Sequence, residues 1–244
     1  MTESVIILEN VTLRFPKLKG ILSMIKDKIT KKNTSFTALK EIDLDIKSGE
    51  VFGLIGKNGS GKSTILRVIS GIYPPDEGQC KVAGKISLLA GLGTGFSGHQ
   101  TGVENALLYG SILGHNESEM QEKLPEIIDF SELGSFIDEP IRTYSAGMKA
   151  RLGLAVATAI KPDILLIDEV LGVGDPQFRD KSKARILSLV KDTSTVVMVS
   201  HSFALMKDIC DRIGVIEKGK LVMIGTPEEA IKAYYELDNG GTLD

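Results

Sequence analysis

Apolar positions along the chain fall into short runs that are separated by glycine-rich or charged segments. Residues 5–15 and 42–54 alternate or run apolar, which predicts two strands near the N-terminus. Two later runs, 164–169 (ILLIDE) and 194–201 (STVVMVSH), are short and apolar and end in polar residues. Such runs are typical of buried parallel strands that carry chemistry at their carboxyl edge.

Helical spacing fills much of the remaining chain. The run 65–72 (ILRVISGI) follows a glycine-rich loop and stops before a pair of prolines, and residues 101–160 are mostly helical in pattern. No internal repeat or low-complexity linker interrupts these segments. The pattern therefore predicts an α/β core with a helical insertion.

The glycine-rich loop matches a phosphate-binding pattern. Residues 56–63 read G-K-N-G-S-G-K-S, a complete match to G-x-x-x-x-G-K-[ST]. Glycines let successive N–H groups point at phosphate oxygens, and the following helix adds its positive N-terminus. Here Lys62 would neutralise the β and γ phosphates, and the Ser63 hydroxyl would bind Mg²⁺. The expected nucleotide-binding residues are Gly56, Lys57, Asn58, Gly59, Ser60, Gly61, Lys62, Ser63 and Thr64. A glycine-rich turn with a chance lysine is the alternative, which the preceding strand and following helix disfavour.

Two acids end the run ILLIDE. A buried strand that ends in Asp168 can hold Mg²⁺, and the adjacent Glu169 can orient or deprotonate an attacking water. Taken alone, an apolar run ending in two acids is a common strand end. Downstream of a phosphate loop, the hydrolytic interpretation is favoured.

The charge of the 244-residue chain is nearly balanced overall but locally uneven. Its 29 basic and 32 acidic residues give −3, which does not indicate nucleic acid as the main partner. Residues 16–40 nevertheless hold seven lysines against one acid, and residues 117–139 hold eight acids against one lysine. The basic segment has the spacing of an amphipathic helix suited to an anionic lipid surface, or it is a long surface loop. For the acidic segment, a solvated helical face is favoured over a binding surface.

The remaining composition bears on location. Cys80 and Cys210 are isolated and lack metal-ligand spacing, which fits a reducing cytosol. We expect no signal peptide and no membrane-spanning segment, because the N-terminus lacks the pattern and no apolar run is long enough. Any membrane role would come through a partner.

The segment 143–152 (TYSAGMKARL) resembles the signature motif, usually L-S-G-G-Q, of the ATP-binding cassette (ABC) ATPases. Independently of the resemblance, Ser145 is a good N-cap, so a hydroxyl and a helix N-terminus would meet one anion. The resemblance implies a P-loop NTPase core with a mostly parallel sheet, an N-terminal antiparallel β subdomain and a helical signature-motif subdomain. It implies a single ABC ATPase domain, whose parts are a core lobe at 1–100 and 161–244, a helical lobe at 101–160 and a basic insertion at 16–37.

The same resemblance implies a site shared between two copies of the chain. Each ATP would lie between the phosphate loop of one copy and Ser145 and Gly147 of the other, with Asp175 in a loop that crosses the dimer interface. His201 matches the family's switch histidine, which contacts the γ-phosphate. Phe15 matches an aromatic residue that stacks on adenine, although it could equally be a core strand residue.

One position departs from the family. Gly91 stands where a glutamine usually senses Mg²⁺ and the transmembrane partner, so the sequence leaves that mechanism open.

The run 92–105 (LGTGFSGHQTGVEN), the signature segment and the basic insertion resemble the subgroup that exports lipid-linked polysaccharides such as O-antigens, capsules and teichoic acids. This implies an ATP-hydrolysing homodimer bound to a separate permease at the cytoplasmic face of the inner membrane, with ATP and Mg²⁺. Some members add a C-terminal carbohydrate-binding domain, which we do not expect in a sequence ending at Asp244. The alternatives are an ABC subunit for another substrate, an ABC ATPase acting on DNA or ribosomes, and a binding module without hydrolysis.

Overall fold

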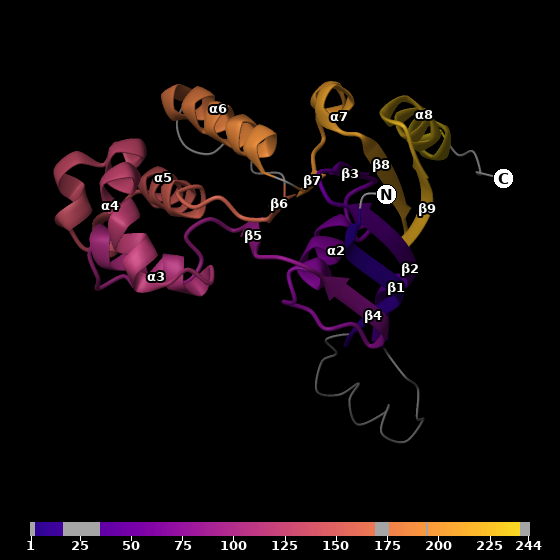
Figure 1. Cartoon of the computed structure of the whole chain (residues 1–244), viewed down its shortest axis with the longest axis horizontal. Helices are drawn as coiled ribbons and strands as arrows, with labels where there is room; N and C mark the ends of the chain where they lie inside the picture. Colours follow the sequence, from indigo (N-terminus) through magenta and orange to yellow (C-terminus); the bar gives the residue numbers. More distant parts are fainter. Residues whose placement is uncertain (1–2, 17–34, 169–175, 194, 240–244) are drawn as a thin grey trace, which may run out of the picture. The chain divides into compact units, whose positions relative to one another are not determined.

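The structure, a computed structural model, describes residues 3–16, 35–168, 176–193 and 195–239 (Figure 1). Two compact units divide the chain. The first comprises Met1–Ser48, Phe52–Ala83 and His201–Asp244, and the second comprises Gly49–Val51 and Gly84–Ser200. The basic insertion is expected at 16–37, and its amphipathic helix, at residues 21–29, lies outside the described residues; the expected lobe boundaries remain a prediction.

An antiparallel sheet forms one part of the first unit. Its order is β2-β1-β4, with bounds β1 (Ser4–Pro16), β2 (Ser35–Lys47) and β4 (Glu77–Val82). Ile6 and Leu8 are buried, and after two exposed residues Val11, Thr12 and Leu13 are all buried, with a register shift against β2 between Leu8 and Val11. Asn10 adopts φ 51° at this bulge, and its N–H donates to Asp43 Oδ1 at 2.7 Å. The simple alternation read from the sequence is thus interrupted by one extra residue.

The other part of the first unit carries a parallel strand pair and three helices. The strands run in the order β3-β8-β9, with β3 parallel to β8 and β9 antiparallel to it. Bounds are β3 (Val51–Ile55), β8 (Arg212–Glu217), β9 (Lys220–Gly225), α2 (Lys62–Ile69), α7 (Phe203–Ile209) and α8 (Pro227–Asp238). A Cβ on Gly53 would lie 2.5 Å from Met206 Cε, so the glycine in β3 lets α7 pack closely on the strand.

The second unit combines three parallel strands with helices. The strand order is β5-β6-β7, with bounds β5 (Ile86–Leu89), β6 (Ile164–Asp168) and β7 (Thr195–Val199). Its helical elements are α3 (Gly102–Ile112), α4 (Glu117–Ser131), η1 (Gly134–Asp138), η2 (Ile141–Thr143), α5 (Ala146–Ala157) and α6 (Pro176–Asp192). Capping boxes start α3 and α4. Within the described residues, no helix is both long and apolar enough to span a bilayer.

Part of the acidic segment meets cations of the same unit. Glu126 pairs with Arg185 of α6, and Glu132 pairs with Lys181 at 2.6 Å and with Arg151 at 3.6 Å. These carboxylates remain partly exposed, so the segment is a hydrated face that also ties α4 to α5 and α6. The sequence suggested the solvated face but not its partners.

Gly153 in α5 gives a direct test of helix packing. A Cβ there would lie 2.7 Å from Gly93 N, whereas a Cβ on Gly147 of the same helix meets Ser145 Oγ at 3.7 Å. Gly153→Ala should therefore lower the free energy of unfolding by about 1–3 kcal/mol, because backbone must shift to accept the methyl group. Gly147→Ala should be neutral or raise it by up to about 1 kcal/mol through helix propensity. Urea unfolding measures both, and equal stability of the two variants would contradict this packing.

Candidate functional site

The phosphate loop lies between β3 and α2 in the first unit. Phe52 and Leu54 of β3 are fully buried, which fixes the point at which the loop begins. Gly56 and Gly61 adopt φ 154° and 116°. A Cβ on Gly56 would overlap the Ile216 carbonyl oxygen, so only glycine lets the loop pass this close to β8.

A turn between β8 and β9 supports the loop. Gly219 N–H donates to Ser60 O at 2.8 Å, and Lys40 N–H donates to Gly219 O at 2.8 Å. Gly219 has φ 81°, and a Cβ there would lie 2.6 Å from Ala38 O. This single residue connects the phosphate loop to β2. Its role was not expected from the sequence, although a glycine between two apolar runs, here Lys218-Gly219, is a turn signal.

Lys62 places its ammonium inside the loop. The side chain is 5% exposed, and Nζ donates to Gly56 O at 2.7 Å and to Lys57 O at 3.0 Å. Ser60 N–H also donates to Lys57 O, at 3.1 Å. The carbonyl of residue 57 therefore accepts two hydrogen bonds from within the loop, one of them from the buried ammonium of Lys62.

The start of α2 is open to an anion. Its N-cap is Gly61, with no side-chain cap among the described residues and no acid in its first turn. By contrast, α3, α4, α5 and α8 each begin with a side chain that accepts a backbone N–H. Ser60 Oγ is buried without a hydrogen-bond partner in the described part of the chain. An orphaned hydroxyl, a buried cation and an uncapped helix terminus together fit a phosphate group.

The other residues predicted for this loop lie near its surface. Lys57, Asn58 and Gly59 are exposed, and Ser63 and Thr64 are half-buried in the first turn of α2. Lys57 Nζ forms an ion pair with Asp238 Oδ1 of α8 at 3.0 Å, which raises the pKa of Lys57. No sequence pattern predicted this contact.

Phe15 is the next-to-last residue of β1 and contacts another aromatic residue. Its ring meets Tyr73 edge-on, with centroids 5.3 Å apart, and it is half-buried. Stacking on adenine remains a prediction for Phe15, and Tyr73 is a neighbour that sequence reasoning did not identify.

The predicted hydrolytic residues are divided between the units. Asp168 ends β6 opposite Val199 and is half-buried in the second unit, whereas His201 is exposed in the first. Glu169 and Asp175 lie outside the described residues. The roles of all four stay predictions.

The signature segment starts α5 as predicted. Ser145 caps the helix, its Oγ accepting the Met148 N–H at 3.2 Å, and its side chain is exposed. The preceding Tyr144 is buried and donates its hydroxyl to Phe136 O. Burial, followed by the nearby Asp138 and Glu139, raises the pKa of Tyr144 to about 12. The buried, neutral phenol of Tyr144 thus holds the residue before the cap in place, while the Ser145 side chain stays at the surface.

Gly91 lies in a tight turn. Thr94 N–H donates to Gly91 O at 2.9 Å, and Gly91 has φ 58°. The following loop is organised by the fully buried Asn105, whose side chain bonds to backbone groups of Ser97, Gln100 and Thr101. No side chain is available at Gly91 for Mg²⁺, and the sequence did not reveal the role of Asn105.

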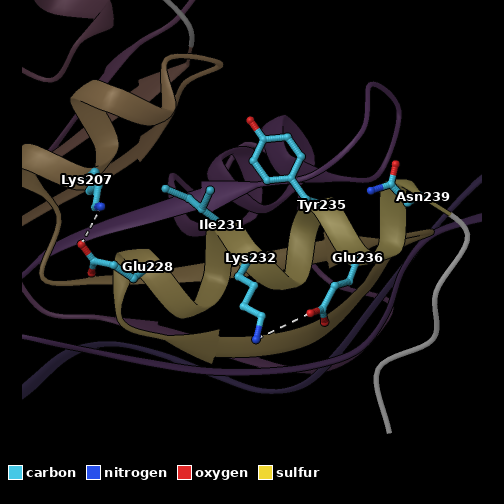
Figure 2. Close-up of a pocket in the computed structure, with 7 residues that line it drawn as sticks. All are labelled: Lys207, Glu228, Ile231, Lys232, Tyr235, Glu236 and Asn239. Atoms are coloured by element: carbon cyan, nitrogen blue, oxygen red, sulfur yellow. Dashed lines mark ion pairs between the residues drawn. The ribbon is translucent and has the colours of Figure 1, made fainter.

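A shallow cavity of about 410 Å³ lies beside α8, away from these loops in sequence (Figure 2). Two ion pairs join residues that line it, Lys207 with Glu228 and Lys232 with Glu236. The lining residues are Lys207, Glu228, Ile231, Lys232, Tyr235, Glu236 and Asn239. Its cations and acids pair with one another, so it offers no evident ligand charge.

Comparison with known proteins gives close relatives. A family model described as ABC transporter matches residues 39–172. The chain is 47% identical over 200 residues to the O-antigen export system ATP-binding protein RfbB of Myxococcus xanthus, covering 82% of this chain and 46% of that protein. It is 41% identical over 221 residues to the teichoic acids export ATP-binding protein TagH of Enterococcus faecalis, covering 91% and 48%. It is also 41% identical over 240 residues to an RfbB of Klebsiella pneumoniae, covering 95% and 98%. The chain spans about half the length of the first two relatives and nearly all of the third.

Solved structures share the fold. A dimeric ATP-binding cassette in a post-hydrolysis state, bound to ADP and phosphate, matches with TM-score 0.68 and 23% identity over 91% of this chain and 98% of that one. An ATP-binding subunit of an ABC transporter matches with TM-score 0.70 and 18% identity over 97% and 93%. These matches confirm the predicted fold class.

Removing the cap of α5 tests the signature geometry. Ser145→Ala should lower the free energy of unfolding by about 1 kcal/mol, because the Met148 N–H loses its acceptor. Ser111→Ala is the matched control, since Ser111 lies inside α3 and donates to Leu107 O at 3.0 Å rather than capping a helix. Chemical denaturation compares them, and a stability loss no larger for Ser145→Ala than for the control would contradict a capping role.

Proposed function

The chain belongs to the ABC transporter family, and from that premise we propose that it is the ATP-hydrolysing subunit of an exporter of lipid-linked polysaccharide, of the O-antigen, capsule or teichoic acid type. The observation that carries ATP binding is the buried Lys62 ammonium beside the uncapped start of α2. The identity to export-system ATP-binding proteins, which extends over 98% of one relative, supports the transported class. An ABC subunit for another substrate is the alternative.

The proposed chemistry begins with the triphosphate in the loop. Lys62 would neutralise charge on the β and γ phosphates from its seat on the loop carbonyls, and the α2 terminus would add backbone N–H groups. Ser60 Oγ would find an acceptor in a phosphate oxygen, which removes the cost of a buried orphan hydroxyl. Phe15 would contact the adenine.

Hydrolysis would require residues that follow the two buried strands. Glu169 would orient or deprotonate the attacking water, and His201 would contact the γ-phosphate. Mg²⁺ would neutralise charge on the phosphates, with Ser63 and Asp168 as its protein ligands. A hydroxyl and a carboxylate are suitable hard oxygen ligands, and the described residues contain no separate cluster of acids, histidines and cysteines that would hold a metal elsewhere.

A second copy of the chain would complete each site. Ser145 holds its hydroxyl at the exposed start of α5, and Gly147 follows without a side chain. This helix terminus would meet the γ-phosphate of ATP bound to the partner copy, with Asp175 near the interface. The homodimer would act on a transmembrane permease at the cytoplasmic face of the inner membrane.

Glu169→Gln tests the hydrolytic assignment. ATP turnover should fall about a hundredfold or more, because the general base is lost, while ATP binding is retained and the dimer is stabilised. Glu122→Gln is the control, since Glu122 is exposed on α4. Phosphate release and equilibrium binding are measured together, and native turnover by Glu169→Gln would show that another group activates the water.

Deleting residues 17–32 tests the basic insertion. Membrane recovery of the chain, co-expressed with its permease, should fall if this segment contacts anionic lipid. Unchanged recovery would contradict the lipid contact without affecting the ATPase assignment.

The neighbouring genes test the substrate: a multi-span permease beside glycosyltransferases supports glycan export, and a periplasmic binding protein favours the alternative.

A further inference from the structure

The C-terminal helix α8 contacts two segments of the first unit that the proposed function places around the nucleotide. At its last turn, Asp238 pairs with Lys57 of the phosphate loop at 3.0 Å. One turn earlier, the rings of Tyr234 and Tyr235 meet Phe203 with centroids 5.1 Å and 5.6 Å apart. Phe203 begins α7 directly after His201 and Ser202. The phosphate loop and the start of α7, which follows His201, therefore both contact the end of α8.

The first turn of α8 is also anchored. Glu228 pairs with Lys207 of α7 at 3.1 Å (Figure 2), and a capping box between Thr226 and Glu229 starts the helix. Pro227 is buried at the first helical position. A helix fixed at both ends can transmit a defined position to the loop that it contacts.

The ion pair reaches the part of the loop on which Lys62 depends. The side chain of Lys57 bonds to Asp238, while its carbonyl accepts from Lys62 Nζ at 3.0 Å and from Ser60 N–H at 3.1 Å. Fixing this side chain would restrict the orientation of the residue 57 peptide, and with it the position of the Lys62 ammonium. The hydrogen bond and charge of Asp238, and then the charge of Glu217, raise the pKa of Lys57 and so favour its charged form.

We propose that Asp238 is a positioning residue for ATP binding: by holding Lys57, the end of α8 keeps the phosphate loop in the form that accepts a triphosphate. This inference rests on the proposed function, because it concerns the same nucleotide site. It assigns to the C-terminal helix a task that neither the phosphate-loop pattern nor the signature motif includes.

Charge and position predict opposite effects at Asp238, which makes the test sharp. Removing a negative charge near a site for anionic ATP should tighten binding if only long-range electrostatics matter. Loss of a positioning contact should weaken binding instead. Since the pair is exposed, we expect Asp238→Asn to raise the ATP dissociation constant by roughly two- to fivefold at low ionic strength. The increase should shrink at high salt, because exposed charges are screened.

The experiment titrates a fluorescent ATP analogue into the full chain and its variants. Glu236→Gln is the matched control, because it removes the same charge from the same helix, and among the described residues Glu236 pairs along α8, with Lys232 at 3.8 Å (Figure 2). Its dissociation constant should stay equal or fall slightly. In a Lys57→Gln background, Asp238→Asn should cause no further weakening, since its partner is already absent. Steady-state kinetics should show the rise in KM with kcat held, and thermal melts should show no difference between the two α8 variants.

An unchanged or tighter dissociation constant for Asp238→Asn would overturn the proposal, as would weakening that persists without Lys57. Failure of the unmodified chain to bind the analogue would instead contradict the proposed function itself. The two failures are therefore distinguishable in one titration series.

Discussion

An uncapped helix terminus beside a buried ammonium is the constraint on which the described site depends. The start of α2 lacks a side-chain acceptor within the described residues, and Lys62 is nearly inaccessible to water. Both features are unfavourable in isolation, because an uncapped helix end and a buried charge cost free energy. Loop carbonyls offset part of this cost in the absence of a ligand, and a phosphate group would offset more.

The surroundings of the loop are arranged to maintain this geometry. Gly56 passes against β8, Gly219 joins the loop to β2, and Asp238 holds its outer side chain. These supports come from chain segments far apart in sequence, so the loop depends on the whole first unit being folded. In the second unit, an analogous task falls to Tyr144, whose buried hydroxyl contact fixes the approach to the capped start of α5.

Local rules predicted the elements whose signal is contained in a few residues. The phosphate loop, the Ser145 cap and the short buried strands all follow from residue type at fixed spacing, and the structure has them at the expected positions. The same rules could not locate the bulge at Asn10, because the bulge depends on the register between β1 and the neighbouring strand β2. They also missed the partners of Glu126 and Glu132, which lie on helices that come together only in the folded chain. Residue propensity and pattern predict the secondary structure of a single segment, whereas these contacts depend on how segments pack in the folded chain.

Amide hydrogen exchange with and without ATP and Mg²⁺ tests the central claim most directly. If the triphosphate is held by the phosphate loop and the open start of α2, the amides of residues 57–64 should become protected on adding ATP, while those of the capped start of α3 at Thr101 should not change. Exchange in residues 57–64 that is the same with and without saturating ATP would contradict the account.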